Sequence, residues 1–215
     1  GTSERSGGIV IQKPLKQWFF KITNYADELL NFDNLDWPQK TVSMQKNWIG
    51  KSLGCSIKFK ISNHKDKVEV FTTRADTIFG VTFIVLSPEH SLVKKISTNE
   101  HIEEINKYIK ISESLSELQR TYDLKVKTGV FTGAYAINPA NNKEIPIWIA
   151  DYVLSSYGTG AIMAVPGHDH RDYMFAKNYK LPILSVVEDR GYEGPPVYNT
   201  NFSGNGHCIN SNFLN

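Results

Sequence analysis

Cysteine is scarce in this chain. Its 215 residues contain only Cys55 and Cys208, which lie far apart and have no second cysteine close by. A zinc ribbon needs paired cysteines, and a disulfide scaffold needs several bridges, so the sequence favours neither. We expect a protein of a reducing compartment.

An excess of one charge is also missing. The chain has 24 Lys and Arg against 22 Asp and Glu, a formal net charge of +2. Binding of nucleic acid through charge alone calls for a more basic protein, so any RNA contact should be local. No apolar run approaches the ~20 residues of a membrane-spanning helix, and we expect no membrane partner.

Several catalytic signatures are absent. No serine or cysteine has an obvious base partner, and the complete phosphate-binding loop Gly-x-x-x-x-Gly-Lys-Ser/Thr does not occur. Residues 158–160, Gly-Thr-Gly, are only a fragment of a dinucleotide-binding fingerprint and are typical of a tight turn. A serine-nucleophile hydrolase and a phosphate-loop enzyme are therefore disfavoured.

The hydrophobic pattern that is present predicts an α/β fold. Apolar and polar residues alternate in two segments that double back as hairpins, 56–72 and 128–153. Apolar runs at 81–86 and 181–187 predict two more strands. Helices are expected at 87–96, at 98–116 with an isoleucine stripe, and at 173–179.

The first fifty residues have a different character. A short strand is expected at 9–11, an aromatic strand-prone run at 15–22 and a helix at 25–30. A longer helix should run from Pro38 to Gly50. Three tryptophans are expected to pack in the core or between elements: Trp18, Trp37 and Trp48.

The stretch from 158 to 172 is the first candidate site. A small, apolar strand over 158–165 is broken by Pro166-Gly167 and followed by a charged run that opens a helix. Architectures of the α/β class often place chemistry at such a point. Asp169 and Asp172 would share one helix face and could hold an ammonium group, a metal or a guanidinium. Alternatively, Asp169 simply caps the helix.

The stretch from 71 to 80 is the second candidate site. It ends an apolar run with two hydroxyls, Thr72 and Thr73, followed by Arg74 and Asp76. Threonines are common in strands, and Arg74 with Asp76 could be a local ion pair, which can coexist with a functional role.

Several blocks together resemble the editing domain of leucyl-tRNA synthetase of the bacterial and organellar type. They follow the family order over nearly the whole chain: 16–23, 45–52, 72–80, 147–154, 157–172 and 209–215. The family motif Thr-Thr-Arg-Pro-Asp-Thr has Ala75 in place of proline, which removes no functional group. The motif Pro-Gly-His-Asp-x-Arg-Asp is intact.

The resemblance implies one editing domain over 1–215, with a leading segment at 1–50, a core at 51–187 and a return segment at 188–215. Its core would be a mixed, barrel-like sheet surrounded by helices. The domain would hydrolyse tRNA(Leu) mischarged with isoleucine, norvaline or methionine and spare leucyl-tRNA(Leu). Its partners would be the 3′ end of tRNA(Leu) and the rest of the synthetase, in a bacterial cytoplasm or an organelle, with the chain itself monomeric.

The resemblance also assigns roles. Asp172 resembles the acid that holds the α-ammonium group of the substrate, and Thr77 resembles the threonine that excludes leucine. Further residues would act in catalysis or line the pocket: Thr72, Thr73, Arg74, Tyr157, Met163, Val165, His168 and Asp169. No metal or cofactor is expected in this chain, whereas the parent enzyme would use ATP and Mg²⁺.

Elementary chemistry agrees with such a site. Binding alone rejects near-isosteric apolar side chains poorly, so a second, hydrolytic sieve is needed. An aminoacyl ester is already activated, and a positioned water suffices to cleave it.

Two other functions remain open from the residues. One is a metal-dependent hydrolase that uses His168, Asp169 and Asp172; His168 and His170, however, are two apart and would point to different sides of a helix, with no third ligand evident. The other is a non-catalytic tRNA-binding module.

We predict that this chain does not activate leucine. The signatures His-Ile-Gly-His and Lys-Met-Ser-Lys-Ser of the synthetic domain are absent from it. Leucine-dependent exchange of pyrophosphate into ATP by the purified chain should not exceed background. Exchange that follows the protein through purification would contradict the interpretation as an isolated editing domain.

Overall fold

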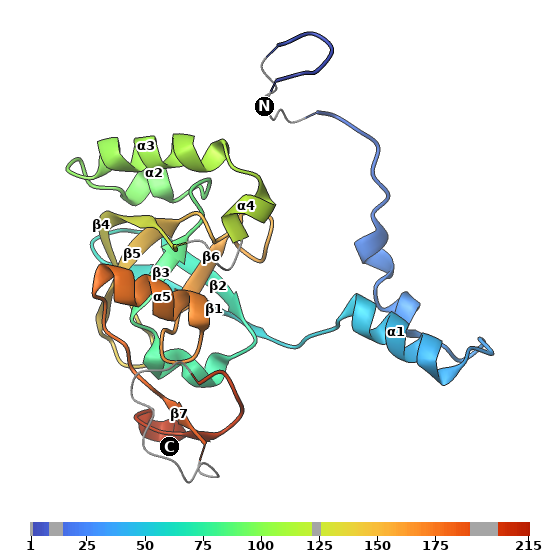
Figure 1. Cartoon of the computed structure of the whole chain (residues 1–215). Helices are drawn as coiled ribbons and strands as arrows, with labels where there is room; N and C mark the ends of the chain where they lie inside the picture. Colours follow the sequence, from blue (N-terminus) through green and yellow to red (C-terminus); the bar gives the residue numbers. More distant parts are fainter. Residues whose placement is uncertain (1, 9–14, 122–125, 190–201) are drawn as a thin grey trace. The chain divides into compact units, whose positions relative to one another are not determined.

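The computed structural model describes residues 2–8, 15–121, 126–189 and 202–215 and contains two compact units, Gly1–Leu53 and Gly54–Asn215 (Figure 1). The strand expected at 9–11 lies outside the described residues. Within the described part of the chain, no helix is both long and apolar enough to cross a membrane.

The first unit contains two short 3-10 turns, Ile22–Tyr25 and Glu28–Leu30, and helix α1, Gln39–Ile49. Helix α1 starts after Pro38 and stops at Gly50, whose φ of 60° suits glycine. The expected strand at 15–22 and helix at 25–30 are wrong. None of the described residues of this unit is buried.

The expectation that the tryptophans of this unit pack in the core or between elements is wrong for Trp18 and Trp48. Trp18 is fully exposed, and 86% of the Trp48 surface is exposed. Trp37 is partly exposed and contacts the ring of Phe32, with 6.0 Å between the ring centroids. Aromatic composition alone therefore did not indicate burial here.

The second unit is built on a six-stranded mixed sheet in the order β2-β1-β4-β5-β3-β6. The strands are β1 Cys55–Ile61, β2 Lys67–Thr72, β3 Phe83–Leu86, β4 Gly129–Ile137, β5 Glu144–Ala150 and β6 Ala161–Ala164. Neighbours are antiparallel except β3 and β5, which are parallel. Both predicted hairpins and the α/β class are confirmed.

The sheet does not close into a barrel. The edge strands β2 and β6 approach each other, but no backbone ladder joins them among the described residues. Instead, the Thr159 hydroxyl donates a hydrogen bond to the Glu69 carbonyl at 2.6 Å. The chain turns through Gly158 and Gly160, both at positive φ, directly before β6, so that only four residues of β6 are extended.

Helices cover the two faces of the sheet (Figure 1). Helices α2 (Val93–Ile96) and α3 (Ile102–Glu113) pack on the cluster that contains Ile84 and Leu86, and α5 (His170–Tyr179) packs on the cluster that contains Phe83 and Val85. Alternation along β3 thus supplies both cores. A short helix, α4, spans Glu117–Thr121.

Two expectations about the remaining elements need correction. The helix expected at 87–96 begins only at Val93, after a turn at 87–90. The strand expected at 181–187 is reduced to β7, Val187–Glu188, paired with β8, His207–Cys208. The amides of Val186 and Val187 bond to the His168 ring rather than to a neighbouring strand. Turns at Ala75–Gly80 (η3) and Asn212–Leu214 (η4) complete the unit.

We predict that Phe175→Ala unfolds the second unit more readily. The fully buried Phe175 ring fastens α5 to the sheet, at 5.3 Å from Phe83 and 5.5 Å from Trp148 between ring centroids. Loss of a buried phenylalanine costs about 3–5 kcal/mol. Urea unfolding followed by circular dichroism should show this loss, whereas Met174→Ala, at an exposed neighbour, should change little. Equal losses in the two variants would contradict the assigned packing.

Candidate active site

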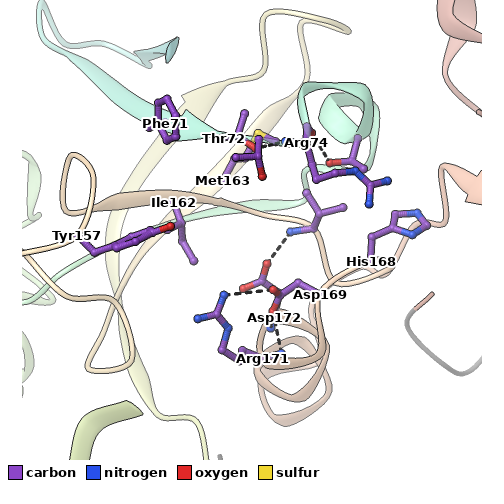
Figure 2. A pocket seen from close by; sticks show the side chains of 13 residues that line it. Phe71, Thr72, Arg74, Tyr157, Ile162, Met163, His168, Asp169, Arg171 and Asp172 are labelled. Atoms are coloured by element: carbon purple, nitrogen blue, oxygen red, sulfur yellow. Dashed lines mark hydrogen bonds and ion pairs between the residues drawn. The ribbon is translucent and has the colours of Figure 1, made fainter. Parts of the chain in front are cut away.

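A cavity of about 220 Å³ lies in the second unit, where the ends of β2 and β6 meet the start of α5 (Figure 2). All ten site residues expected from the sequence line it: Thr72, Thr73, Arg74, Thr77, Tyr157, Met163, Val165, His168, Asp169 and Asp172. Two stretches far apart in the sequence are thus brought to one place.

The first turn of α5 is capped by Asp169. Its Oδ1 accepts hydrogen bonds from the backbone amides of Arg171, at 2.8 Å, and Asp172, at 3.1 Å. Its Oδ2 also pairs with the Arg171 guanidinium at 3.2 Å. The capping interpretation of Asp169 is confirmed, and the cap fixes the helix start from which Asp172 reaches the cavity.

Asp172 is the buried acid of the site, with 4% of its surface exposed. The Val165 amide donates to its Oδ2 at 2.9 Å, and the Tyr152 hydroxyl donates to its Oδ1 at 3.1 Å. Each carboxylate oxygen can accept more than one hydrogen bond, so capacity for a cation remains.

The pKa of Asp172 is unusually high. Burial, and after it the charge of Asp169, raises the pKa from 3.8 to about 7. The bonds from Val165 and Tyr152 oppose this effect. Asp172 is therefore poised to change its charge near neutral pH, which is common among functional carboxylates.

The threonine-rich stretch is folded around Arg74. The Thr72 hydroxyl accepts a hydrogen bond from the Arg74 amide at 3.0 Å, and the buried Thr77 hydroxyl donates to the Arg74 carbonyl at 2.8 Å. The exposed Thr73 hydroxyl makes no hydrogen bond within the described part of the chain. Thr73 thus offers a hydroxyl to a ligand, whereas Thr77 offers bulk.

Arg74 itself is engaged in the expected local ion pair. Its guanidinium contacts the Asp76 carboxylate, with Nη2 to Oδ2 at 2.9 Å, and this hydrogen bond raises the pKa of Arg74 against the effect of burial. Its Nη1 also reaches the carbonyls of Ser203 and Gly204, both at 3.5 Å. Arg74 therefore connects the threonine-rich turn to the C-terminal segment.

Both ring nitrogens of His168 are hydrogen bonded within the protein. Its Nε2 accepts hydrogen bonds from the amides of Val186, at 2.8 Å, and Val187, at 3.1 Å, which leaves the proton on Nδ1 to donate to the Phe202 carbonyl at 2.6 Å. Burial lowers the pKa of His168, in keeping with a neutral ring. A metal could use either nitrogen only after breaking these bonds.

The geometry therefore does not fit a metal centre built on His168, Asp169 and Asp172. No group of three or more potential ligands is suitably placed for a metal among the described residues. Asp169 is also occupied, because its oxygens serve the helix cap and Arg171.

Three lining residues were not expected from the sequence: Phe71, Ile162 and Arg171. Phe71 directly precedes Thr72, and Arg171 lies inside the intact motif, so both could have been found from their neighbours. Ile162 could not have been found in this way. Strand alternation predicts that Ile162 points away from Met163, whereas both residues line the cavity. Figure 2 shows Phe71, Ile162 and Tyr157 on one side of the cavity, with Arg74 and His168 on the other.

Together these residues can bind a small cationic group with an apolar side chain. The buried carboxylate of Asp172 suits an ammonium group. Met163 and Val165 supply an apolar wall, and Thr73 supplies a polar one. Such a set can orient an aminoacyl group without a covalent nucleophile.

Comparison with known proteins gives a consistent result. Residues 46–215 match the protein family described as "Leucyl-tRNA synthetase, editing domain". The structure is similar to the agnB2 LeuRS of Agrobacterium radiobacter K84, solved as a ternary complex with tRNA and LeuAMS, with 35% sequence identity and a TM-score of 0.68. The match covers 91% of this chain but only 24% of the length of that LeuRS.

We predict that Asp172→Asn becomes more stable than the wild type as the pH rises. A buried acid whose pKa is raised from 3.8 to about 7 stabilises the fold most below pH 4, and that contribution is lost as the pH rises through 7. Asparagine can still bond to Val165 and Tyr152 but does not ionise.

Urea unfolding at pH 5 and pH 8 measures this difference, which should grow with pH by up to about 1.4 kcal/mol for each unit between the two pKa values. Glu103→Gln, at an exposed position on α3, should track the wild type. A difference between Asp172→Asn and wild type that stays constant with pH would show that Asp172 does not titrate as described.

Proposed function

The chain belongs to the editing-domain family of leucyl-tRNA synthetases, and from this we propose that it hydrolyses the aminoacyl ester of mischarged tRNA(Leu). Its substrates would carry isoleucine, norvaline or methionine, and leucyl-tRNA(Leu) would be spared. The parent enzyme would attach leucine to tRNA(Leu) with ATP and Mg²⁺, and this chain would act at the 3′ end of the product without a cofactor of its own.

One observation carries the proposal: a buried carboxylate, Asp172, lies in a cavity together with the threonine-rich turn 72–77 and an apolar wall. An aminoacyl ester presents a matching set of groups, namely an ammonium, an ester carbonyl and a side chain. Asp172 would pair with the ammonium, Met163 and Val165 would contact the side chain, and Thr73 would hydrogen bond to the ester.

The reaction needs only water. The water oxygen attacks the ester carbonyl carbon, the bond from that carbon to the ribose oxygen breaks, and the ribose oxygen takes up a proton. The products are the free amino acid and tRNA with an intact 3′ hydroxyl. The contribution of the protein would be to hold the ester and the water in reacting geometry, which can lower the barrier by about 7–11 kcal/mol.

The decisive experiment is deacylation by the purified chain of isoleucyl-, norvalyl- and leucyl-tRNA(Leu), with and without EDTA. We expect the first two to be hydrolysed and the third to be spared, with no effect of EDTA. Binding of tRNA(Leu) without hydrolysis above the buffer rate would favour a non-catalytic module. Activity that EDTA removes and a metal restores would favour a metal-dependent hydrolase.

We predict that Thr77→Ala gains hydrolysis of leucyl-tRNA(Leu). Thr77 is 2% exposed, lines the cavity and has its hydroxyl fixed on the Arg74 carbonyl, so its bulk has a defined place. Steric rejection by one or two heavy atoms is worth about 1–3 kcal/mol, so the gain in kcat/KM should be tens-fold.

Thr77→Val is the matched control, because it also loses the bond to Arg74 but keeps the bulk. It should lose a similar amount of stability and still spare leucyl-tRNA(Leu). If both variants spare leucyl-tRNA(Leu) as the wild type does, Thr77 is only a structural residue of the η3 turn.

A further inference from the structure

The Asp172 carboxylate is held by one backbone donor and one side-chain donor. The backbone donor is the Val165 amide, which follows β6, and the side-chain donor is the Tyr152 hydroxyl, which follows β5. Tyr152 does not line the cavity and has no role in the proposed chemistry so far. Its hydroxyl nevertheless contacts the one acid on which that chemistry depends.

The position of the Tyr152 ring is fixed by packing. Only 3% of Tyr152 is exposed, and its ring lies 5.9 Å from that of Phe175, between centroids. Phe175 and Asp172 are both on α5, three residues apart, and therefore on neighbouring turns of one face. The same helix thus positions both the ring of Tyr152 and the carboxylate that its hydroxyl meets.

The Tyr152 hydroxyl favours the ionised form of Asp172. Burial, together with the charge of Asp172, raises the pKa of Tyr152 well above 10, so the hydroxyl stays protonated. A donor to a carboxylate favours its charged form and opposes the effect of burial. In a site that receives an ammonium group, this bond keeps a larger fraction of Asp172 ionised near neutral pH.

Resting on the proposed function, we propose that Tyr152 is a positioning residue for the hydrolysis: its buried hydroxyl orients the Asp172 carboxylate and stabilises its charge for the substrate ammonium group. The substrate contacts Asp172 and not Tyr152. The identity of residue 152 then sets the pH range in which the site works.

The other charged groups around Asp172 can be separated from this effect. Asp169 and Arg171 lie on α5 beside it and act on its titration. Across the cavity, Arg74 is paired with Asp76, and His168 is neutral. Removal of an uncharged hydroxyl leaves all of these charges in place, so a shift in the titration of Asp172 would report on the hydroxyl itself.

The test is Tyr152→Phe, read as the pH dependence of kcat/KM for deacylation of isoleucyl-tRNA(Leu). Loss of a hydrogen bond to a charged group should move the acidic limb upward by about one pH unit. Such a shift lowers the rate about fivefold at pH 7 and about twofold at pH 8, because the ionised fraction of Asp172 falls accordingly.

Tyr179→Phe is the matched control. Tyr179 is in the same aromatic layer, 4.6 Å from Phe175 between centroids, but its hydroxyl bonds to the backbone of Gly129. It should lower the melting temperature without moving the pH profile. A Tyr152→Phe profile with the same acidic limb as wild type and Tyr179→Phe would overturn the proposal.

Two further measurements keep the result clear. Replacement of Tyr152 by 3-fluorotyrosine, a stronger donor of nearly the same shape, should move the acidic limb to lower pH. This variant also serves if Tyr152→Phe is unstable: an acidic limb that stays at the wild-type pH in the 3-fluorotyrosine variant overturns the proposal.

Asp172→Asn tests the proposed function separately. If it retains hydrolysis, the ammonium role of Asp172 fails, whereas if only the Tyr152 shift is missing, the proposed function stands and the positioning role fails.

Discussion

The burial of one carboxylate constrains the whole site. Asp172 is held by a backbone amide after β6, a hydroxyl after β5 and a helix start capped by Asp169. A buried acid without such donors would be costly, so these three segments must keep their relative places for the acid to be tolerated. The arrangement of the cavity therefore follows largely from the solvation of a single group.

Other residues of the cavity serve the structure as much as a ligand. His168 ties together the segments at 186–187 and 202, and Arg74 links the threonine-rich turn to 203–204. Residues of this kind look catalytic in a sequence motif because they are polar and lie beside the site. Their hydrogen bonds explain instead how the loops around the cavity are held in place.

Local patterns made most of the core predictable. The two hairpins follow from alternation and turn residues, and α5 follows from its cap and the preceding break. A strand was expected at 181–187, but only the short β7 forms, because the Val186 and Val187 amides bond to the His168 side chain, which is distant in the sequence. The open edge between β2 and β6 likewise depends on contacts between segments far apart in the sequence. Aromatic composition did not predict the exposure of Trp18 and Trp48. For the site, family motifs identified ten lining residues, whereas the contact of Tyr152 with Asp172 appears only in three dimensions.

The parallel pair of β3 and β5 also bears on how the cavity forms during folding. β3 lies between β5 and β6 in the sheet, although the chain reaches β4 and β5 only after the helices that follow β3. Each hairpin can form from neighbouring residues, but the β3–β5 contact requires a long loop to close first, at an entropic cost. The two walls of the cavity, at 71–77 and 157–172, are also far apart in the sequence and come together only through contacts of this long-range kind. We therefore expect the cavity to form together with the complete sheet and not within either hairpin alone.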